Sequence, residues 1–111
     1  MAFHGASAPP KHLRTATKKW WTGVLDEYDL EPSEIRLLTL AGEAWDRGQQ
    51  AREIVDSEGM TFLDRFGQPK ARPEIGIERD SRIGFARLLR ELALDIGEPD
   101  NRPPGLARNG G

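Results

Sequence analysis

The stretch from residue 32 to residue 58 constrains the fold of this chain more than any other feature. Its apolar and small side chains recur every three to four residues, which is the period of an amphipathic helix. Pro32 suits the first position of a helix, and Leu30 can pack onto Ile35 as a hydrophobic staple. Gly59 is expected to end the helix in a left-handed C-terminal cap. The sequence therefore predicts one long helix over 32–58.

A second helix is expected to pack against this long helix. The small residues that would let another backbone approach closely are Ala41, Gly42, Ala44, Gly48 and Ala51. The preceding segment has apolar residues at helical spacing after Thr15 or Thr17 as the N-cap, namely Trp20, Trp21, Val24, Leu25 and Tyr28. We therefore expect a short helix beginning near residue 15, which forms an antiparallel hairpin with the long one.

Beyond Gly59 the pattern changes from helical to extended. Residues 60–63 favour a strand, Gly67 signals a turn, and Pro69 lies in the segment that returns. The proline restricts this return strand to a sheet edge or a bulge. The sequence predicts a β-hairpin over 60–72, which is marginal in water by itself. A neighbouring subunit is its simplest cover.

The last predicted element is a helix that begins at Pro73. Its apolar residues at helical spacing are Ile75, Ile83, Phe85, Leu89 and Leu92. Gly97 and Pro99 are expected to stop it. The predicted fold is mainly α, with an antiparallel helical hairpin, a short β-hairpin and then a third helix.

Three regions of the chain are expected to behave differently. Residues 1–14 are predicted to form a flexible basic arm, residues 15–97 a helical assembly domain, and residues 98–111 a disordered tail. A domain this small buries only part of its surface, so we expect its apolar faces to pack against copies of the chain. The candidates for core or oligomer packing are Trp20, Trp21, Trp45, Phe62, Phe85 and Leu89.

Basic and acidic residues are separated along the sequence. Residues 1–19 hold four basic residues and no acid, whereas residues 26–58 hold ten acids against three arginines. A basic arm suits contact with phosphates or with an acidic partner, or it serves solubility alone. The candidate DNA contacts are Lys11, Arg14, Lys18 and Lys19 near the N-terminus, and Arg65, Lys70 and Arg72 on the predicted β-hairpin. The tryptophans that follow Lys19 fit a core better than a platform for stacking bases.

Several kinds of chemistry lack the residues they need. The chain has no cysteine, which excludes disulfides and thiolate sites and fits a reducing compartment. It has no GxxxxGK[ST] phosphate loop, and its two histidines, His4 and His12, both lie in the predicted arm. No apolar run has the length of a signal peptide or a membrane span. We therefore expect a cytoplasmic, non-enzymatic protein with no metal, no cofactor and no membrane partner.

A carboxylate-rich connection is the one place where the sequence allows a metal-dependent reaction. Its acids are Asp26, Glu27, Asp29, Glu31 and Glu34. A nuclease acts through metal held by a buried and oriented set of carboxylates. Acids at helix ends more simply stabilise helix dipoles or stay solvated, and we favour that interpretation.

The order of these segments resembles the short small-terminase family of tailed phages. The resemblance lies in "HLRTATKKWW", "LLTLAGEAWDR", "EGMTFLDRFGQPKARPEI" and "FARLLRELALD", and it covers about residues 11–96. It implies a subunit of a ring oligomer in the host cytoplasm that recognises double-stranded viral DNA. It also implies that the ring regulates a large terminase subunit, which holds the ATPase and the nuclease, during DNA packaging. The chain departs from better-known members because it lacks a clear N-terminal helix-turn-helix, which leaves its DNA-reading element unassigned.

Two other functions are compatible with the same residues. In the first, the chain is a helical adaptor that binds only proteins, and its basic arm docks on an acidic partner. In the second, it is a small DNA-binding regulator, although a short helix-turn-helix linker and a basic exposed helix face are missing.

Overall fold

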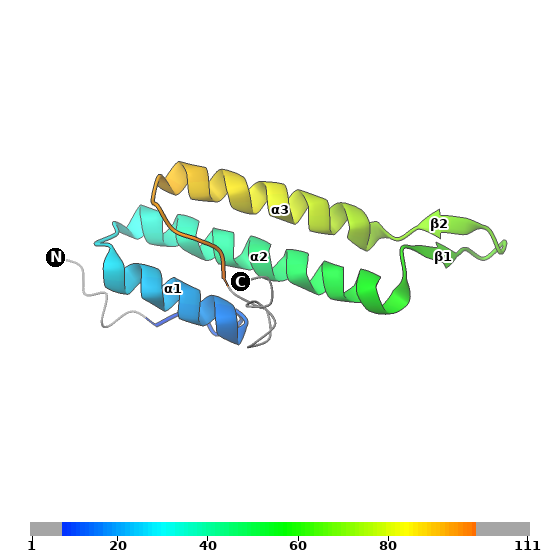
Figure 1. Ribbon diagram of the computed structural model, residues 1–111, viewed down its shortest axis with the longest axis horizontal. Helices are drawn as coiled ribbons and strands as arrows, with labels where there is room; N and C mark the ends of the chain where they lie inside the picture. The colour runs from blue at the N-terminus through cyan, green and yellow to red at the C-terminus, as the bar shows by residue number, and fades with distance from the viewer. Residues whose placement is uncertain (1–7, 100–111) are drawn as a thin grey trace, which may run out of the picture.

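The computed structural model describes residues 8–99, which form three helices and one two-stranded antiparallel sheet. The elements are α1 (Thr15–Glu27), α2 (Pro32–Glu58), β1 (Thr61–Leu63), β2 (Pro69–Ala71) and α3 (Pro73–Leu92). The helices lie side by side, and the sheet projects beyond one end of α2 and α3 (Figure 1). The mainly helical fold and the β-hairpin over 60–72 are thus confirmed. The outer parts of the expected arm and tail, residues 1–7 and 100–111, lie outside the described residues.

Helix α2 has the bounds that the sequence predicts, and local contacts fix both of its ends. Glu31 and Glu34 form a reciprocal capping box at the start, in which the Glu31 N–H donates to Glu34 Oε1 at 2.8 Å. At the other end, the Gly59 N–H donates to the Val55 carbonyl at 2.8 Å. Gly59 has φ 93° and ψ 171°, so the expected left-handed helical cap is wrong. Its positive φ still favours glycine, because the chain turns there directly into β1.

The start of α1 differs from the sequence prediction. Arg14 is the N-cap residue and makes no side-chain capping bond, whereas Thr15 and Thr17 lie inside the helix. The Thr17 hydroxyl donates instead to Asp46 Oδ1 on α2, at 2.5 Å. The buried Thr17 side chain therefore has a tertiary partner on α2 in place of the local cap that the sequence indicated.

The main core lies where all three helices are present. α1 runs antiparallel to α2 as expected, but the pairing of α2 with α3 is the more extensive one (Figure 1). The side chains buried in this core are Leu13, Trp21, Val24, Leu25, Leu30, Leu38 and Leu92. A second cluster, formed by Ala41, Ala44 and Phe85, continues between α2 and α3. The expected hairpin of the first two helices is thus part of a larger unit, in which α2 and α3 carry the β-hairpin at their tip.

A glycine allows α2 and α3 to approach closely beyond this core. A Cβ atom at Gly48 would lie 3.2 Å from the Cβ of Ser81, which is itself buried. Toward the β-hairpin the helix pair has no third helix beside it (Figure 1). Ile77 and Ile83 of α3 are accordingly exposed.

Helix α3 ends earlier than the sequence predicts. It stops at Leu92 rather than near Gly97, because Ala93 takes a left-handed conformation with φ 57°. The chain then turns back across the helices, and Leu94 and Ile96 pack against the main core. The packing of these two partly buried side chains against the core favours the turn at Ala93 over continuation of the helix to the glycine. Within residues 8–99 no helix is long and apolar enough to cross a bilayer.

Candidate nucleic-acid interface

The part of the expected arm that the structure describes, residues 8–14, is packed rather than free. Leu13 is only 4% exposed and belongs to the main core. Its methyl groups lie 3.6 Å from the position that a Cβ at Gly42 would occupy. The prediction of a flexible arm over 1–14 is therefore wrong for this part. That prediction rested on the small and turn-forming residues at the start of the chain and overlooked Leu13, which the fold buries.

Arg14 is held by the acidic face of α2 and is not presented to a ligand. Its guanidinium donates to both carboxylate oxygens of Glu53, at 2.7 and 3.0 Å, and its backbone N–H donates to Asp46 Oδ2 at 2.8 Å. These hydrogen bonds with Glu53 raise the pKa of Arg14 and lower the pKa of Glu53. Arg14 is thus paired within the fold, as an arginine and a carboxylate often are.

His12 also contacts α2, whereas Lys11 does not take part in an ion pair within residues 8–99. The His12 Nε2 atom lies 2.8 Å from Glu43 Oε2 at the surface. Lys11 is exposed, and Lys19 is exposed on α1, while Lys18 is half-buried. In the described part of the chain none of these three lysines has a carboxylate within ion-pair distance. They form the first candidate contact for phosphate, which we call the α1 lysines.

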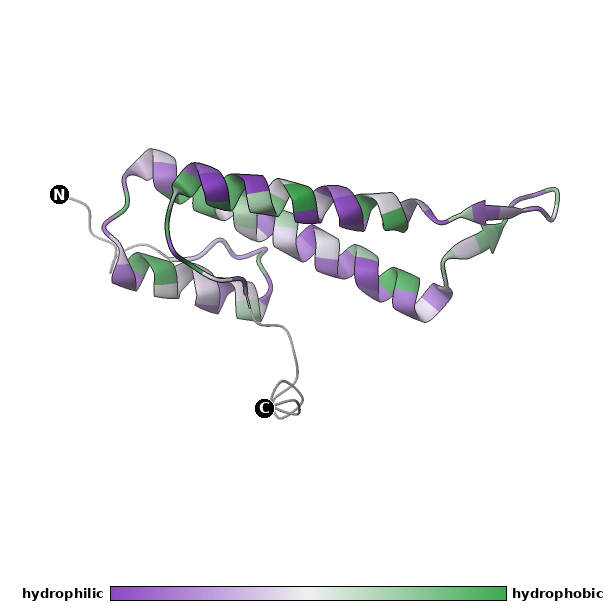
Figure 2. Cartoon of the chain, turned by 45° about the horizontal axis from the view of Figure 1, so that its top comes forward, coloured by the Kyte–Doolittle hydropathy of each residue, from purple (hydrophilic) through white to green (hydrophobic). Residues whose placement is uncertain are grey.

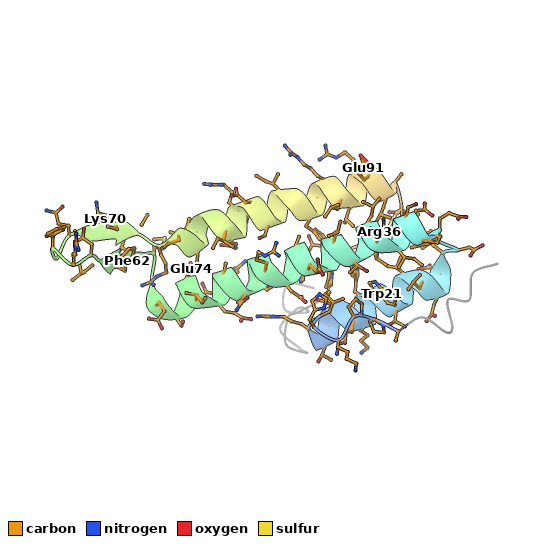
Figure 3. All side chains as sticks on the ribbon, turned by 180° about the vertical axis from the view of Figure 1, so that it is seen from behind. Trp21, Arg36, Phe62, Lys70, Glu74 and Glu91 are labelled. Atoms are coloured by element: carbon orange, nitrogen blue, oxygen red, sulfur yellow. The ribbon has the colours of Figure 1, made fainter. Side chains whose placement is uncertain are left out.

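The tryptophans beside these lysines belong to the fold. Trp21 is buried, lies between α1 and α2 (Figure 3), and donates from Nε1 to Thr39 Oγ1 at 3.0 Å. Trp20 is half-buried, packs 5.9 Å from the ring of Phe85, and donates to the Gly97 carbonyl at 2.7 Å. Neither ring is free to stack on a base, because Trp21 belongs to the main core and Trp20 packs against it.

The other residues expected to pack divide between the core and the surface. Phe85 is buried, and Leu89 and Trp45 are partly buried against it, with the Trp45 and Phe85 ring centroids 5.0 Å apart. Phe62 lies on the β-hairpin and is 39% exposed. Its role in packing is therefore confined to local contacts within the described chain.

The β-hairpin, which we call the ribbon, presents only two of its three candidate cations. The Arg72 guanidinium donates to the carbonyls of Gly59, Glu58 and Thr61 at 2.8 to 3.2 Å and lies 5.9 Å from the Phe62 ring centre. Arg72 therefore anchors the base of the ribbon. Lys70 and Arg65 are exposed, and Arg65 lies over the ring of Phe66 at 5.1 Å.

The two candidate surfaces are separate in the fold. The start of α1, the helix that carries Lys18 and Lys19, lies beside the middle of α2, whereas Lys70 is on the ribbon that projects past the helix ends (Figures 1 and 3). The structure therefore does not assemble the seven basic candidates into one patch. It leaves five of them available at two places.

The carboxylate-rich connection between α1 and α2 is used in part by the fold. Glu31 and Glu34 form the capping box of α2. No group of three histidine, aspartate or glutamate side chains within the described residues is arranged to hold a metal ion.

A cleft runs along one side of the α2–α3 pair. Its volume is about 550 Å³, and its lining includes Trp45, Gly48, Phe85, Ala86, Leu89 and Ile96. Arg52, Glu78 and Arg82 also line it. The indole N–H of Trp45 is buried and has no acceptor in the part of the chain that the structure describes. The cleft is thus mainly apolar, with some charged groups in its lining.

The acidic residues that hold the N-terminal segment were missed by sequence reasoning. Glu43, Asp46 and Glu53 lie on one face of α2 and contact His12, Arg14 and Thr17. Their spacing of three and seven residues was a visible signal of a shared helix face.

Comparisons of the chain with protein-family models, with curated proteins and with solved structures found no match.

Proposed function

We propose that this chain is a non-catalytic DNA-packaging adaptor of the small-terminase type. It assembles into a ring, binds duplex viral DNA and regulates a separate large subunit that carries the ATPase and the nuclease. The resemblance in the order of elements suggests this class. The observation that carries the DNA-binding part is that the α1 lysines and two ribbon cations have no carboxylate partner within residues 8–99.

The positions of these cations favour contact with a polyanion. Lys19 and Lys70 are exposed, whereas Arg14 and Arg72 already donate hydrogen bonds to groups within the fold. α2 has a net negative charge, which opposes binding of DNA along its surface. DNA is therefore expected to contact the start of α1 and the ribbon, and to avoid the acidic face of α2.

Assembly supplies the affinity that a single chain lacks. Each phosphate contact releases a counterion, and a few contacts per chain give weak binding alone. A ring presents the same cations many times, so its contacts add through avidity. Ring formation and DNA binding are then coupled properties of one protein.

The experiment measures binding to a fluorescent DNA duplex by anisotropy over a series of salt concentrations. The double variant Lys18→Gln/Lys19→Gln is compared with Arg36→Gln/Arg87→Gln, which also removes two positive charges but from exposed positions on α2 and α3. The lysine variant is expected to bind more weakly, with a salt slope that falls by about 0.9 for each phosphate that is no longer neutralised in the complex. The arginine variant is expected to keep the slope of the unmodified chain.

The alternatives give different results in this experiment. A chain that shows no binding to duplex DNA at low salt is not a DNA-packaging adaptor, and the adaptor that binds only proteins is then favoured. The exposed apolar residues of the ribbon are the observation that supports this second candidate. A chain that binds DNA as a single copy would instead be a small DNA-binding regulator.

A further inference from the structure

The two faces of the ribbon differ in charge. In the strand register Thr61 pairs with Ala71, and Leu63 pairs with Pro69. Directly paired residues project from the same face of an antiparallel sheet, so these four side chains share one face. None of them is charged. Lys70 pairs with Phe62 and lies on the opposite face, which also holds Arg72 over the Phe62 ring.

The uncharged face is exposed along its whole length. Both strands consist of exposed residues, and Leu63 is 69% exposed. Phe66, in the turn that joins the strands, is 74% exposed. The ribbon extends away from the helices with apolar residues along β1 (Figure 2). Because a two-stranded ribbon is marginal in water, a partner that covers this face would stabilise it. An uncharged face does not suit phosphate, so this partner is protein.

The α2–α3 cleft has the complementary character. Its lining is mainly apolar and includes Trp45, Phe85 and Leu89. Ala86, which is exposed, contributes only a small side chain to this lining.

A second copy of the chain is the partner that these surfaces fit. The ribbon points away from the helices that form the cleft, so it does not fill the cleft of its own chain (Figure 1). The cleft lining holds two bases, Arg52 and Arg82, and two acids, Glu78 and Glu98. Because these charges balance, the cleft suits the uncharged ribbon face of another copy better than a strongly charged partner.

We propose that the ribbon of one copy docks in the α2–α3 cleft of the next, with its uncharged face against the cleft. This contact rests on the proposed function, whose ring it would build. It joins two different surfaces, so it is head-to-tail, and repetition of such a contact closes a ring when the rotation between copies allows. Lys70, on the opposite face of the ribbon, stays outside the contact. Docking then fixes the position of the ribbon cations relative to DNA.

The test uses two variants of the full chain that each damage one half of the contact. Leu63→Lys places a positive charge on the uncharged ribbon face, and Ala86→Lys places a positive charge in the cleft, so the two changed surfaces repel each other. Both positions are exposed, so neither change removes a core side chain, and circular dichroism checks that the helices are retained. Lys70→Gln, on the other ribbon face, is the matched control. Masses are measured by sedimentation velocity and native mass spectrometry.

The unmodified chain and Lys70→Gln are expected to form the same oligomer. Each docking variant alone is expected to associate at least about tenfold more weakly, which corresponds to about 1.4 kcal/mol. A mixture of the two variants should form a one-to-one dimer and nothing larger, because the pair retains one intact ribbon and one intact cleft. A self-complementary contact would not be rescued by mixing.

Three results would overturn the docking proposal. They are a monomeric unmodified chain, docking variants that keep the full oligomer mass, and a mixture that forms no dimer. DNA binding, measured separately by anisotropy, distinguishes this failure from failure of the proposed function. If the docking test fails but the chain still binds DNA in a salt-dependent way, only the proposed ribbon–cleft contact is rejected. An assembled oligomer without DNA binding rejects the function and leaves the contact standing.

Discussion

The hydroxyl of Thr17, which is completely buried, donates a hydrogen bond to Asp46 Oδ1 at 2.5 Å. The second oxygen of the same carboxylate accepts the backbone N–H of Arg14 at 2.8 Å. One aspartate on α2 thus fixes both the entry into α1 and the first turn of that helix. The position of the α1 lysines follows from this contact, because Lys18 and Lys19 come directly after Thr17.

Replacing Thr17 by valine should lower the stability of the fold. Valine keeps the shape of the side chain and removes its donor, which leaves the Asp46 oxygen short of a partner. Hydrogen bonds to charged groups contribute about 1.5–3 kcal/mol, and a loss of that size in the free energy of unfolding is expected from urea titration. Thr17→Ser keeps the hydroxyl and should lose less. A Thr17→Val variant that is as stable as the unmodified chain, with a larger loss in Thr17→Ser, would show that the hydroxyl is unimportant and that the methyl group matters.

Leu13 should behave as a core residue although it lies in a basic segment. Leu13→Ala removes a side chain that is 4% exposed, and the expected loss in the free energy of unfolding is about 2–5 kcal/mol. Leu40→Ala is the matched control, because Leu40 is 44% exposed on α2. Denaturant titration of both variants compares the two positions. A negligible effect at Leu13 would contradict its place in the core and would indicate that residues 8–14 form a free arm.

Two helical glycines should respond in opposite ways to alanine. A Cβ at Gly23 of α1 would meet no atom of the described chain within 4 Å, so Gly23→Ala is expected to stabilise the fold by up to about 1 kcal/mol through helix propensity. A Cβ at Gly48 would meet Ser81 at 3.2 Å, which adds an overpacking cost of roughly 1–3 kcal/mol. Gly48→Ala should therefore show a lower melting temperature than Gly23→Ala. If Gly48→Ala is equally stabilising, α2 and α3 have room for a methyl group at this point and do not approach as closely as described.

The pair formed by Arg14 and Glu53 should make stability depend on pH in the acid range. The pKa of Glu53 is lowered in the folded chain by its hydrogen bonds with Arg14. Its contribution is complete above the ordinary glutamate pKa, about 4.3, and is lost as the pH falls through the lowered value. Glu53→Gln should remove that part of the acid dependence. The loss at neutral pH should be small, about 1 kcal/mol or less, because the pair is at the surface.

The titration of this variant needs a control because other carboxylates also titrate. Glu58→Gln is suitable, since Glu58 is exposed on the same helix and has no side-chain partner within residues 8–99. Thermal melts at a series of acidic to neutral pH values should show a smaller change of slope for Glu58→Gln than for Glu53→Gln. Identical profiles would contradict a specific role of the Arg14 contact.

Local signals in the sequence were sufficient to place most of the fold. Pro32 and Gly59 bound α2, Pro73 begins α3, and the change of period after Gly59 locates the ribbon. These features act on the backbone of the residues that carry them, so they can be recognised without knowledge of the tertiary structure. The ends that failed depend on distant residues. The packing of Leu94 and Ile96 against the core accompanies the end of α3 before Gly97.

The candidate interface was harder to predict, because a sequence does not show which charges are paired. Arg14 and Arg72 are of the same residue type as Arg65, yet both are held within the fold. Arg14 pairs with Glu53, which lies 39 residues away in the sequence, and Arg72 binds backbone carbonyls that lie 11 to 14 residues away. The two strands of the ribbon were predicted from the sequence, but the pairing of Leu63 with Pro69 was needed to identify its uncharged face. The cleft could not be predicted at all, since it exists only between α2 and α3.

The central claim, that copies of this chain assemble and bind duplex DNA together, is tested most directly by native mass spectrometry of the full chain with and without a DNA duplex. Cooperative assembly predicts one discrete oligomer well above the monomer mass of 12.4 kDa, and a second species heavier by one duplex that disappears as the salt concentration rises. A stable monomer that gives no complex with DNA at low salt would contradict it.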